Sequence, residues 1–209
     1  MMNPPPDAPP PARNGPRLHI RPVKAVVIGT SAGGPAALQV LLARLDPKLA
    51  AAVVVLSHVG PNGPDLLADI LAPTCPLPTR IAQERTAVEP GVVHIAPSGY
   101  HLLIERDHTF SLSVDPKVHF SRPAIDVLFV SAAAAYGPAL AGVVLTGASR
   151  DGATGLADIR EAGGYAMVQD PREAAFTTMP QSAIEIAGAE LCAPLIVIAE
   201  HINRLACHD

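Results

Sequence analysis

Residues 24–35, KAVVIGTSAGGP, decide the fold that this sequence predicts. A run of apolar and β-branched residues leads into a turn of small residues, and a helical pattern over residues 36–45 follows at once. A strand, a tight turn and a helix in this order present a turn side chain at the carboxyl edge of a sheet. Gly29 to Gly33 also match G-x-S-x-G, which makes Ser31 a candidate nucleophile. Two alternatives stay open at this point: a phosphate-binding loop before a helix N-terminus, and a plain strand-to-helix connection.

The composition is typical of a protein with a large aliphatic core. Hydrophobic residues make up 49% of the 209 residues and aromatic residues only 3%. The net charge of -4, with acidic and basic residues interspersed, argues against a basic surface for nucleic acid or for a membrane. No apolar run approaches the roughly 18 residues of a spanning helix. The three cysteines form no CxxC pair, which favours a reducing compartment. We therefore expect a cytoplasmic protein that binds no nucleic acid and does not insert into a membrane.

Residues 1–22 differ in kind from the rest of the chain. Prolines punctuate this segment, and it contains hardly any residues that could build a core. Such a segment cannot bury enough apolar surface to offset the entropy of ordering it. We predict a disordered Pro-rich tail over residues 1–22 and one folded domain over residues 23–209. A proline-rich ligand for a partner domain is the alternative for the tail.

From residue 24 onward, predicted strands alternate with predicted helices. Continuous apolar runs indicate strands that are buried on both faces of a parallel sheet. An alternating segment at residues 102–114 predicts a hairpin with a two-residue turn, Arg106-Asp107, at the edge of that sheet. The predicted fold class is α/β: a doubly wound, mainly parallel sheet with helices on both faces and an antiparallel hairpin. The strands are expected at 25–28, 52–56, 140–145 and 165–169, and the helices at 36–45, 64–71, 123–136, 153–162, 180–186 and 194–205.

Polar residues follow three of the predicted strands, and parallel strands end at one rim of a sheet. They are Ser31, His58 and Asp151. A serine needs a base to take its proton, and a histidine base needs a carboxylate to orient it. Taken singly, His58 could be a loop histidine packed on the neighbouring turn, and Asp151 could cap the helix that begins near Gly152. Together the three residues predict a Ser–His–Asp triad.

Two other kinds of site fit the sequence less well. A dinucleotide site needs G-x-G-x-x-G and an acidic residue at the end of the second strand, but Ser31 replaces the middle glycine and His58 ends that strand. His94, His101 and His108 are spaced by seven residues, which suggests a metal, yet no acidic or cysteine ligand pattern accompanies them. We expect neither a metal nor a cofactor.

Six blocks of the sequence occur in the order found in the catalytic domain of the chemotaxis methylesterase CheB, and the chain resembles that family over residues 24–205. The resemblance implies a doubly wound α/β fold and the hydrolysis of glutamate γ-methyl esters on the cytoplasmic helices of chemoreceptors, which releases methanol. It also implies that Ser31, His58 and Asp151 are the catalytic serine, histidine and aspartate. The blocks are VIGTSAGG (27–34), SHV (57–59), VHIAP (93–97), RPAIDVLF (122–129), VLTGASRDG (144–152) and FTTMP (176–180).

The sequence departs from the family pattern at three places. The Pro-rich residues 1–22 stand where the usual family protein has a receiver domain, so the resemblance covers the catalytic domain only. Residues 146–149 are TGAS where the family commonly has TGMG. Ser121 stands where a histidine often precedes the RPAIDVLF block.

The expected chemistry is acyl transfer through Ser31. Backbone N–H groups would hold the oxyanion, with Ala32 as the first candidate and Ala148 as the second, in a loop region that also includes Thr30 and Gly147. The same steps could deamidate a glutamine side chain, because both reactions pass through a tetrahedral intermediate. Two alternatives stay open: a non-catalytic signalling module that docks a receptor or partner helix, and an esterase for another methyl ester.

Overall fold

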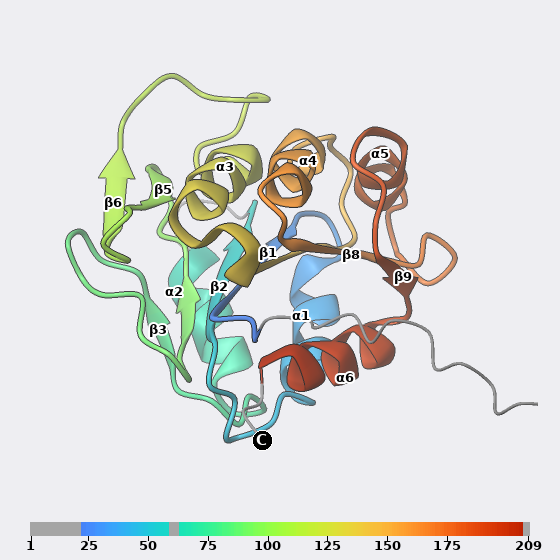
Figure 1. Ribbon diagram of the computed structural model, residues 1–209, viewed down its shortest axis with the longest axis horizontal. Coiled ribbons are helices and arrows are strands. Elements are labelled where there is room, and N and C mark those ends of the chain that lie inside the picture. The colour runs from blue at the N-terminus through green and yellow to red at the C-terminus, as the bar shows by residue number, and fades with distance from the viewer. Residues whose placement is uncertain (1–21, 59–62, 207–209) are drawn as a thin grey trace, which may run out of the picture.

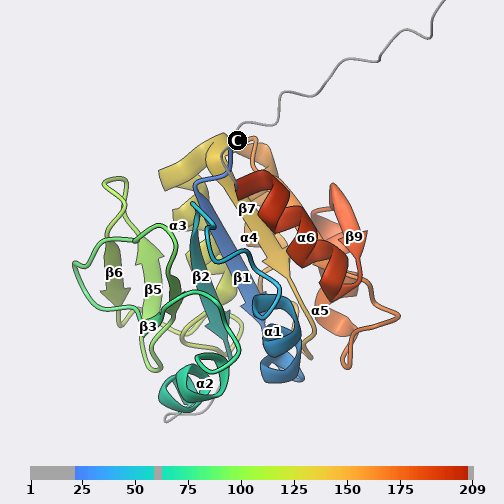
Figure 2. The ribbon, with the colours of Figure 1, turned by 90° about the horizontal axis from the view of Figure 1, so that it is seen from below.

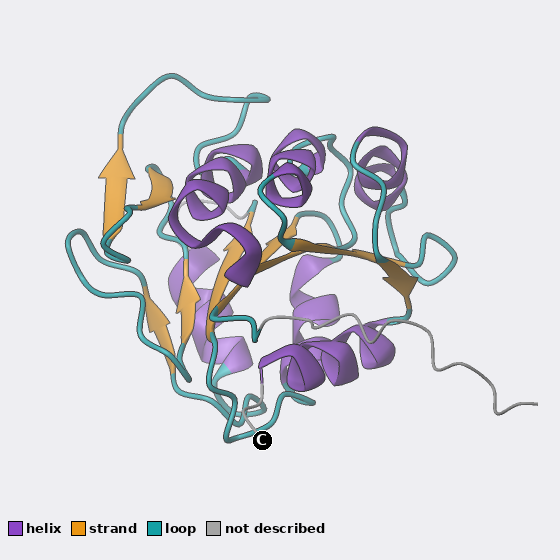
Figure 3. Cartoon of the chain, in the orientation of Figure 1, coloured by secondary structure: helices purple, strands orange, loops and turns teal. Residues whose placement is uncertain are grey.

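The computed structural model describes residues 22–58 and 63–206 of the chain (Figure 1). Within them, one parallel sheet lies between two layers of helices, and a small hairpin lies to one side (Figures 1 and 3). The predicted fold class is therefore confirmed. The predicted tail lies, except for its last residue, outside the described residues, so the division into a tail and a domain stays a prediction.

The central sheet has the strand order β3-β4-β2-β1-β7-β8-β9, and every neighbouring pair is parallel. All residues of β1, β2 and β7 are buried, which explains why these segments show continuous apolar runs instead of alternation. The three strands lie side by side at the centre of the sheet. The bounds are β1 Ala25–Thr30, β2 Ala52–Ser57, β3 Thr79–Ile81, β4 Val93–Ile95, β7 Leu140–Val144, β8 Tyr165–Gln169 and β9 Leu191–Ala193.

Helices cover both faces of the sheet (Figures 1 and 2). One face carries α1 (Gly34–Leu42), α2 (Gly63–Leu71) and α6 (Leu195–Ala206). The opposite face carries α3 (Ile125–Tyr136), α4 (Ala153–Glu161) and α5 (Thr178–Ile186), and a short 3-10 turn, Gly137–Ala139, follows α3. Within the described part of the chain, no helix is long and apolar enough to cross a membrane.

The antiparallel hairpin exists, but its predicted place at the edge of the main sheet is wrong. Strands β5 (His101–Ile104) and β6 (Phe110–Ser113) form a separate two-stranded sheet. Its apolar residues belong to the core that α3 also builds, and the N–H of Ile104 donates to Ser131 Oγ on α3 (3.1 Å). The turn has three residues, not two, because the N–H of Glu105 bonds to the carbonyl of Thr109 and His108 adopts a φ of 62°.

The edges of the main sheet are β3 and β9, which the sequence analysis missed. Each strand has only three residues, too few to show a periodic pattern. Two helix boundaries also differ from the prediction. The first helix begins at Gly34 and ends at Leu42, and α3 begins at Ile125, two residues after Pro123.

Helices α3 and α4 lie in close contact at Gly155. A Cβ atom at this position would lie 2.6 Å from Cβ of Phe129 and 3.0 Å from the carbonyl oxygen of Asp126, both on α3. The backbone oxygen cannot move aside without displacing the first turn of α3. The absence of a side chain at Gly155 therefore sets the distance between the N-terminal ends of these two helices.

We expect Gly155→Ala to destabilise the protein by about 1–3 kcal/mol, because the added methyl group overpacks the α3–α4 contact. The direction of this change in stability is informative, since replacing glycine by alanine inside a helix otherwise stabilises the helix by roughly 0.5–1 kcal/mol. The free energy of unfolding, measured by urea titration, tests this. Thr154→Ala, at the exposed neighbouring position, serves as the control and should change stability by less than about 0.5 kcal/mol. An unchanged or increased stability of Gly155→Ala would contradict the close approach.

Candidate functional site

Ser31 lies directly after β1, on a turn that is tied to the loop following β7. The N–H of Ser31 donates to the carbonyl of Thr146 (3.0 Å), and Thr30 Oγ1 donates to the same carbonyl (2.8 Å). Thr146 Oγ1 donates in return to the carbonyl of Ala32 (3.0 Å). The next residue, Gly147, lies so close that a Cβ atom there would be 2.9 Å from Cβ of Ser31. These contacts hold Ser31 at the carboxyl edge of the two adjacent strands.

His58 and Asp151 form a hydrogen-bonded pair at the same edge. His58 Nε2 lies 2.9 Å from Asp151 Oδ2, and the Asp151 side chain is fully buried. The N–H of His58 donates to the carbonyl of Thr30 (3.2 Å), which brings the histidine next to the turn that carries Ser31. The structure thus gathers all three predicted residues at one rim. Among the described residues, none is hydrogen-bonded to Ser31 Oγ.

The Asp151 carboxylate also caps a helix, but not the one that the sequence suggested. It accepts hydrogen bonds from the N–H groups of Ile125 (2.7 Å) and Asp126 (2.9 Å), the first two residues of α3. Burial alone would raise the pKa of Asp151. The hydrogen bonds from His58 and from the two N–H groups outweigh burial, so the pKa of Asp151 is lower than its usual value of 3.8.

The pairing also decides which nitrogen of His58 is left to act as a base. An ionised carboxylate can only accept hydrogen bonds, so the proton of the neutral ring lies on Nε2, which faces Asp151. Nδ1 then carries the lone pair that can take a proton.

A second carboxylate, Asp126, was missed by the sequence analysis. It caps α4, because its Oδ1 accepts hydrogen bonds from the N–H groups of Gly152 (2.9 Å) and Gly155 (2.7 Å). Its Oδ2 lies 3.0 Å from His119 Nε2. Burial, reinforced by the nearby charge of Asp151, raises the pKa of Asp126, although its backbone hydrogen bonds and His119 act in the opposite direction. The one signal in the sequence was an acidic residue inside the apolar block RPAIDVLF.

The four residues expected near the oxyanion differ in whether they have a group that can donate a hydrogen bond to it. The N–H of Gly147 already donates to the carbonyl of Phe176 (3.1 Å), and Thr30 is fully buried, with its hydroxyl used to hold the turn. Among the described residues, none accepts a hydrogen bond from the N–H groups of Ala32 or Ala148. These two backbone groups therefore remain the candidates for holding an oxyanion.

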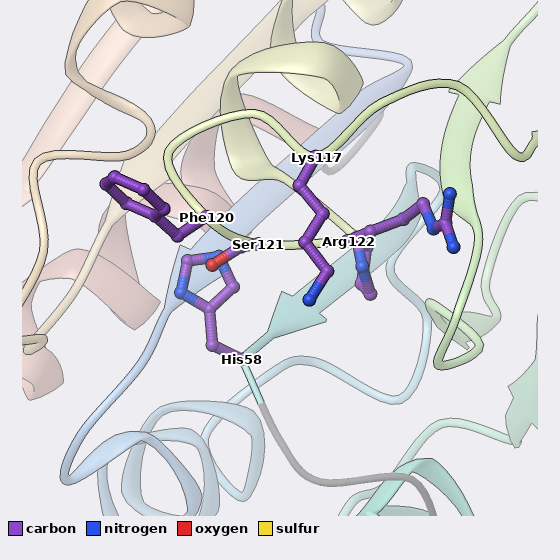
Figure 4. A pocket seen from close by; sticks show the side chains of 6 residues that line it. His58, Lys117, Phe120, Ser121 and Arg122 are labelled. Carbon is purple, nitrogen blue, oxygen red and sulfur yellow. The ribbon is translucent and has the colours of Figure 1, made fainter.

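A pocket of about 260 Å³ opens beside His58. Figure 4 shows the side chains of His58, Ser121 and Lys117, which line this pocket. The pocket gives a substrate access to the histidine. Its lining residues are His58, Lys117, Phe120, Ser121, Arg122 and Pro123.

The three histidines that suggested a metal do not come together. His94 Nε2 accepts a hydrogen bond from the N–H of Glu89, His101 Nδ1 accepts one from the N–H of Ala124, and the ring of His108 stacks on Tyr136. In the described part of the chain, the group with metal-like spacing is His119, Asp126 and Asp151, whose ligand atoms lie within 4.8 Å of one another. The hydrogen bonds given above already occupy both carboxylates, so this group is explained without an ion.

We expect Asp151→Asn to lower the free energy of unfolding at pH 7 by about 1–3 kcal/mol, because an amide cannot accept all the hydrogen bonds that the carboxylate accepts. The pKa of Asp151 is lower in the folded protein than in the unfolded chain, so its charge stabilises the fold above the unfolded value near 3.8. That contribution is lost as the pH falls through the lower, folded-state pKa. Urea titrations of both proteins between pH 7 and pH 2 should show the stability difference shrinking below about pH 4. A difference that stays constant or grows on acidification would contradict the lowered pKa.

Comparisons with known proteins show the family to which the chain belongs. The family model described as CheB methylesterase matches residues 26–202. A protein of Leptospira interrogans, provisionally named a protein-glutamate methylesterase/protein-glutamine glutaminase, is 44% identical over 182 residues, which are 87% of this chain and 94% of that protein. A protein-glutamate methylesterase/protein-glutamine glutaminase of Anaeromyxobacter dehalogenans is 42% identical over 86% of this chain and 51% of its own length.

A solved structure gives the same result. The crystal structure of the Thermotoga maritima CheB methylesterase catalytic domain superposes with a TM-score of 0.85 and 33% sequence identity, covering 88% of this chain and 98% of that chain. The matched region contains the turn after β1, His58 and Asp151. The chain therefore belongs to the CheB methylesterase family.

Proposed function

We propose that this protein is a cytoplasmic serine hydrolase that cleaves glutamate γ-methyl esters on the cytoplasmic helices of chemoreceptors to glutamate and methanol. The observation that carries the proposal is the hydrogen bond between His58 and the buried Asp151, at the rim where Ser31 follows β1. Membership of the CheB methylesterase family supports the reaction class, and the names of the relatives supply the substrate class.

The reaction begins when Ser31 Oγ attacks the ester carbonyl and His58 Nδ1 takes its proton. The ionised Asp151 stabilises the resulting imidazolium through Nε2–H, and it keeps the ring in the required orientation. The tetrahedral intermediate collapses, and His58 returns the proton to the departing methanol. The acyl group is now bound to Ser31. Water, activated by His58, then releases the glutamate carboxylate.

The negative charge of the intermediate forms on the former carbonyl oxygen. The N–H groups of Ala32 and Ala148 are assigned to it, because they have no acceptor within the described residues. Donors that are already in place need no reorganisation during the reaction, and each contributes about 3–4 kcal/mol.

Deamidation of a glutamine side chain is a second candidate activity. The specific observation in its favour is that the relatives' names pair the methylesterase with a protein-glutamine glutaminase. The same residues can perform it, since ammonia replaces methanol as the group that leaves the tetrahedral intermediate.

We expect Ser31→Ala and His58→Ala each to reduce methanol release from a methylated chemoreceptor fragment by roughly 10³-fold or more. Gas chromatography of released methanol gives the rate, and urea titration checks that each variant is folded. Ser111→Ala on β6, a serine that does not line the pocket, is the matched control and should stay within about twofold of the original rate. Retained turnover by a folded Ser31→Ala protein would remove Ser31 from the mechanism.

A fluorophosphonate probe separates this enzyme from a non-catalytic module that only docks a helix. An activated Ser31 should react with the probe, and His58→Ala should abolish the labelling although it leaves the serine in place. Peptide mass spectrometry identifies the labelled residue. An inert but folded protein would favour the docking module. Methanol release from small methyl esters, compared with release from receptor fragments, tests the other alternative, an esterase for a different substrate.

A further inference from the structure

Phe120 is the most exposed of the large hydrophobic residues in the described part of the chain. Phe120 is 97% exposed, although it lines the pocket beside His58 (Figure 4). A single exposed apolar side chain is ordinary. This one has a second property: it lies beside the histidine that the proposed mechanism uses as its base.

Several hydrogen bonds hold the loop that carries Phe120. His119, the preceding residue, pairs with Asp126 at 3.0 Å, and the backbone groups of Val118 and Ser121 bond to each other (2.9 and 3.2 Å). Arg122 donates from its guanidinium group to the carbonyls of residues 114 and 115 (2.6 and 3.0 Å). The outward direction of Phe120 is thus set by a defined loop conformation.

The same loop places positive charge at the pocket. Lys117 is exposed, lines the pocket (Figure 4), and has no ion-pair partner among the described residues. None of the residues that line the pocket is acidic. The two aspartates behind His58 are buried and hydrogen-bonded. The accessible wall of the site is therefore apolar at Phe120 and cationic at Lys117.

We propose that residues 117–122, the recognition loop, bind an acidic segment of helix that carries the methylated glutamate. Phe120 packs against an apolar side chain of that helix, and Lys117 pairs with a carboxylate about one turn from the reacting residue. A helix suits this loop because side chains three and four residues apart lie on one face of a helix. One of these side chains can enter the pocket while its neighbours contact residues 117–122. Charge complementarity favours an acidic partner over a neutral or basic one. The inference rests on the proposed function, and it adds the residues that select the substrate.

Binding and turnover of Lys117→Glu and Phe120→Ala test the recognition loop. The ligand is a fluorescently labelled, methylated chemoreceptor cytoplasmic fragment, and the Kd is measured by anisotropy with the intact protein. Each variant should raise the Kd and lower kcat/KM for the fragment about tenfold. Hydrolysis of p-nitrophenyl acetate, which has neither a helix nor a carboxylate for these residues to bind, should fall less in both variants than hydrolysis of the fragment. Added salt should weaken binding by the unmodified protein more than binding by Lys117→Glu.

Two matched controls lie away from the pocket. Lys48→Glu reverses the charge of an exposed lysine in the loop before β2, near the amino ends of the strands. Val130→Ala truncates an apolar residue of α3 that is 46% exposed. Both should leave the Kd unchanged.

Three results would overturn the inference. They are equal effects of the control and loop variants on the Kd, equal losses of activity on the fragment and on the small ester, and an unchanged Kd for both loop variants. If the unmodified protein binds the fragment but releases no methanol, the proposed reaction fails while the Kd values still decide the recognition loop. Failure of the unmodified protein to bind overturns the inference itself.

Discussion

Two buried carboxylates that cap each other's helices are the constraint on which the site depends. Asp151 precedes α4 but accepts hydrogen bonds from the first residues of α3, whereas Asp126 lies in the first turn of α3 and accepts hydrogen bonds at the start of α4. Buried negative charge is costly unless it is compensated. Here the unpaired N–H groups and the positive ends of two helix dipoles provide that compensation. The close contact at Gly155 lets both carboxylates reach across.

This reciprocal capping makes Asp151 suitable as the partner of His58. A carboxylate held by two backbone N–H groups cannot rotate freely, so the direction of its remaining contact is set before any substrate arrives. The low pKa of Asp151 keeps its carboxylate ionised at neutral pH. The sheet supplies the other half of the arrangement. Because β2, β1 and β7 are adjacent, His58, Ser31 and the loop that leads to Asp151 emerge next to one another.

Asp126 links the His58–Asp151 pair to residues 117–122, the proposed recognition loop. One of its oxygens supports α4, and the other holds His119 beside the exposed Phe120. The pKa of Asp126 is raised because the residue is buried close to a second negative charge, and its backbone hydrogen bonds and His119 oppose this rise only in part. A single carboxylate therefore aligns the helix starts behind the site and anchors the surface in front of it.

The sequence by itself determined the layered α/β architecture and the edge of the sheet at which the candidate residues lie. Continuous apolar runs identified the buried strands, and the rule that parallel strands end at one edge brought Ser31, His58 and Asp151 together as candidates. Only the tertiary structure decided that Asp151 caps α3, that Asp126 caps α4, that His58 presents Nδ1, and that the N–H of Gly147 is already used. It also decided that the hairpin leaves the main sheet, and that β3 and β9 form its edges. The physical reason is the separation of the interacting residues along the sequence. Apolar periodicity is a local property, whereas these contacts join residues that are more than twenty positions apart and depend on how whole helices pack.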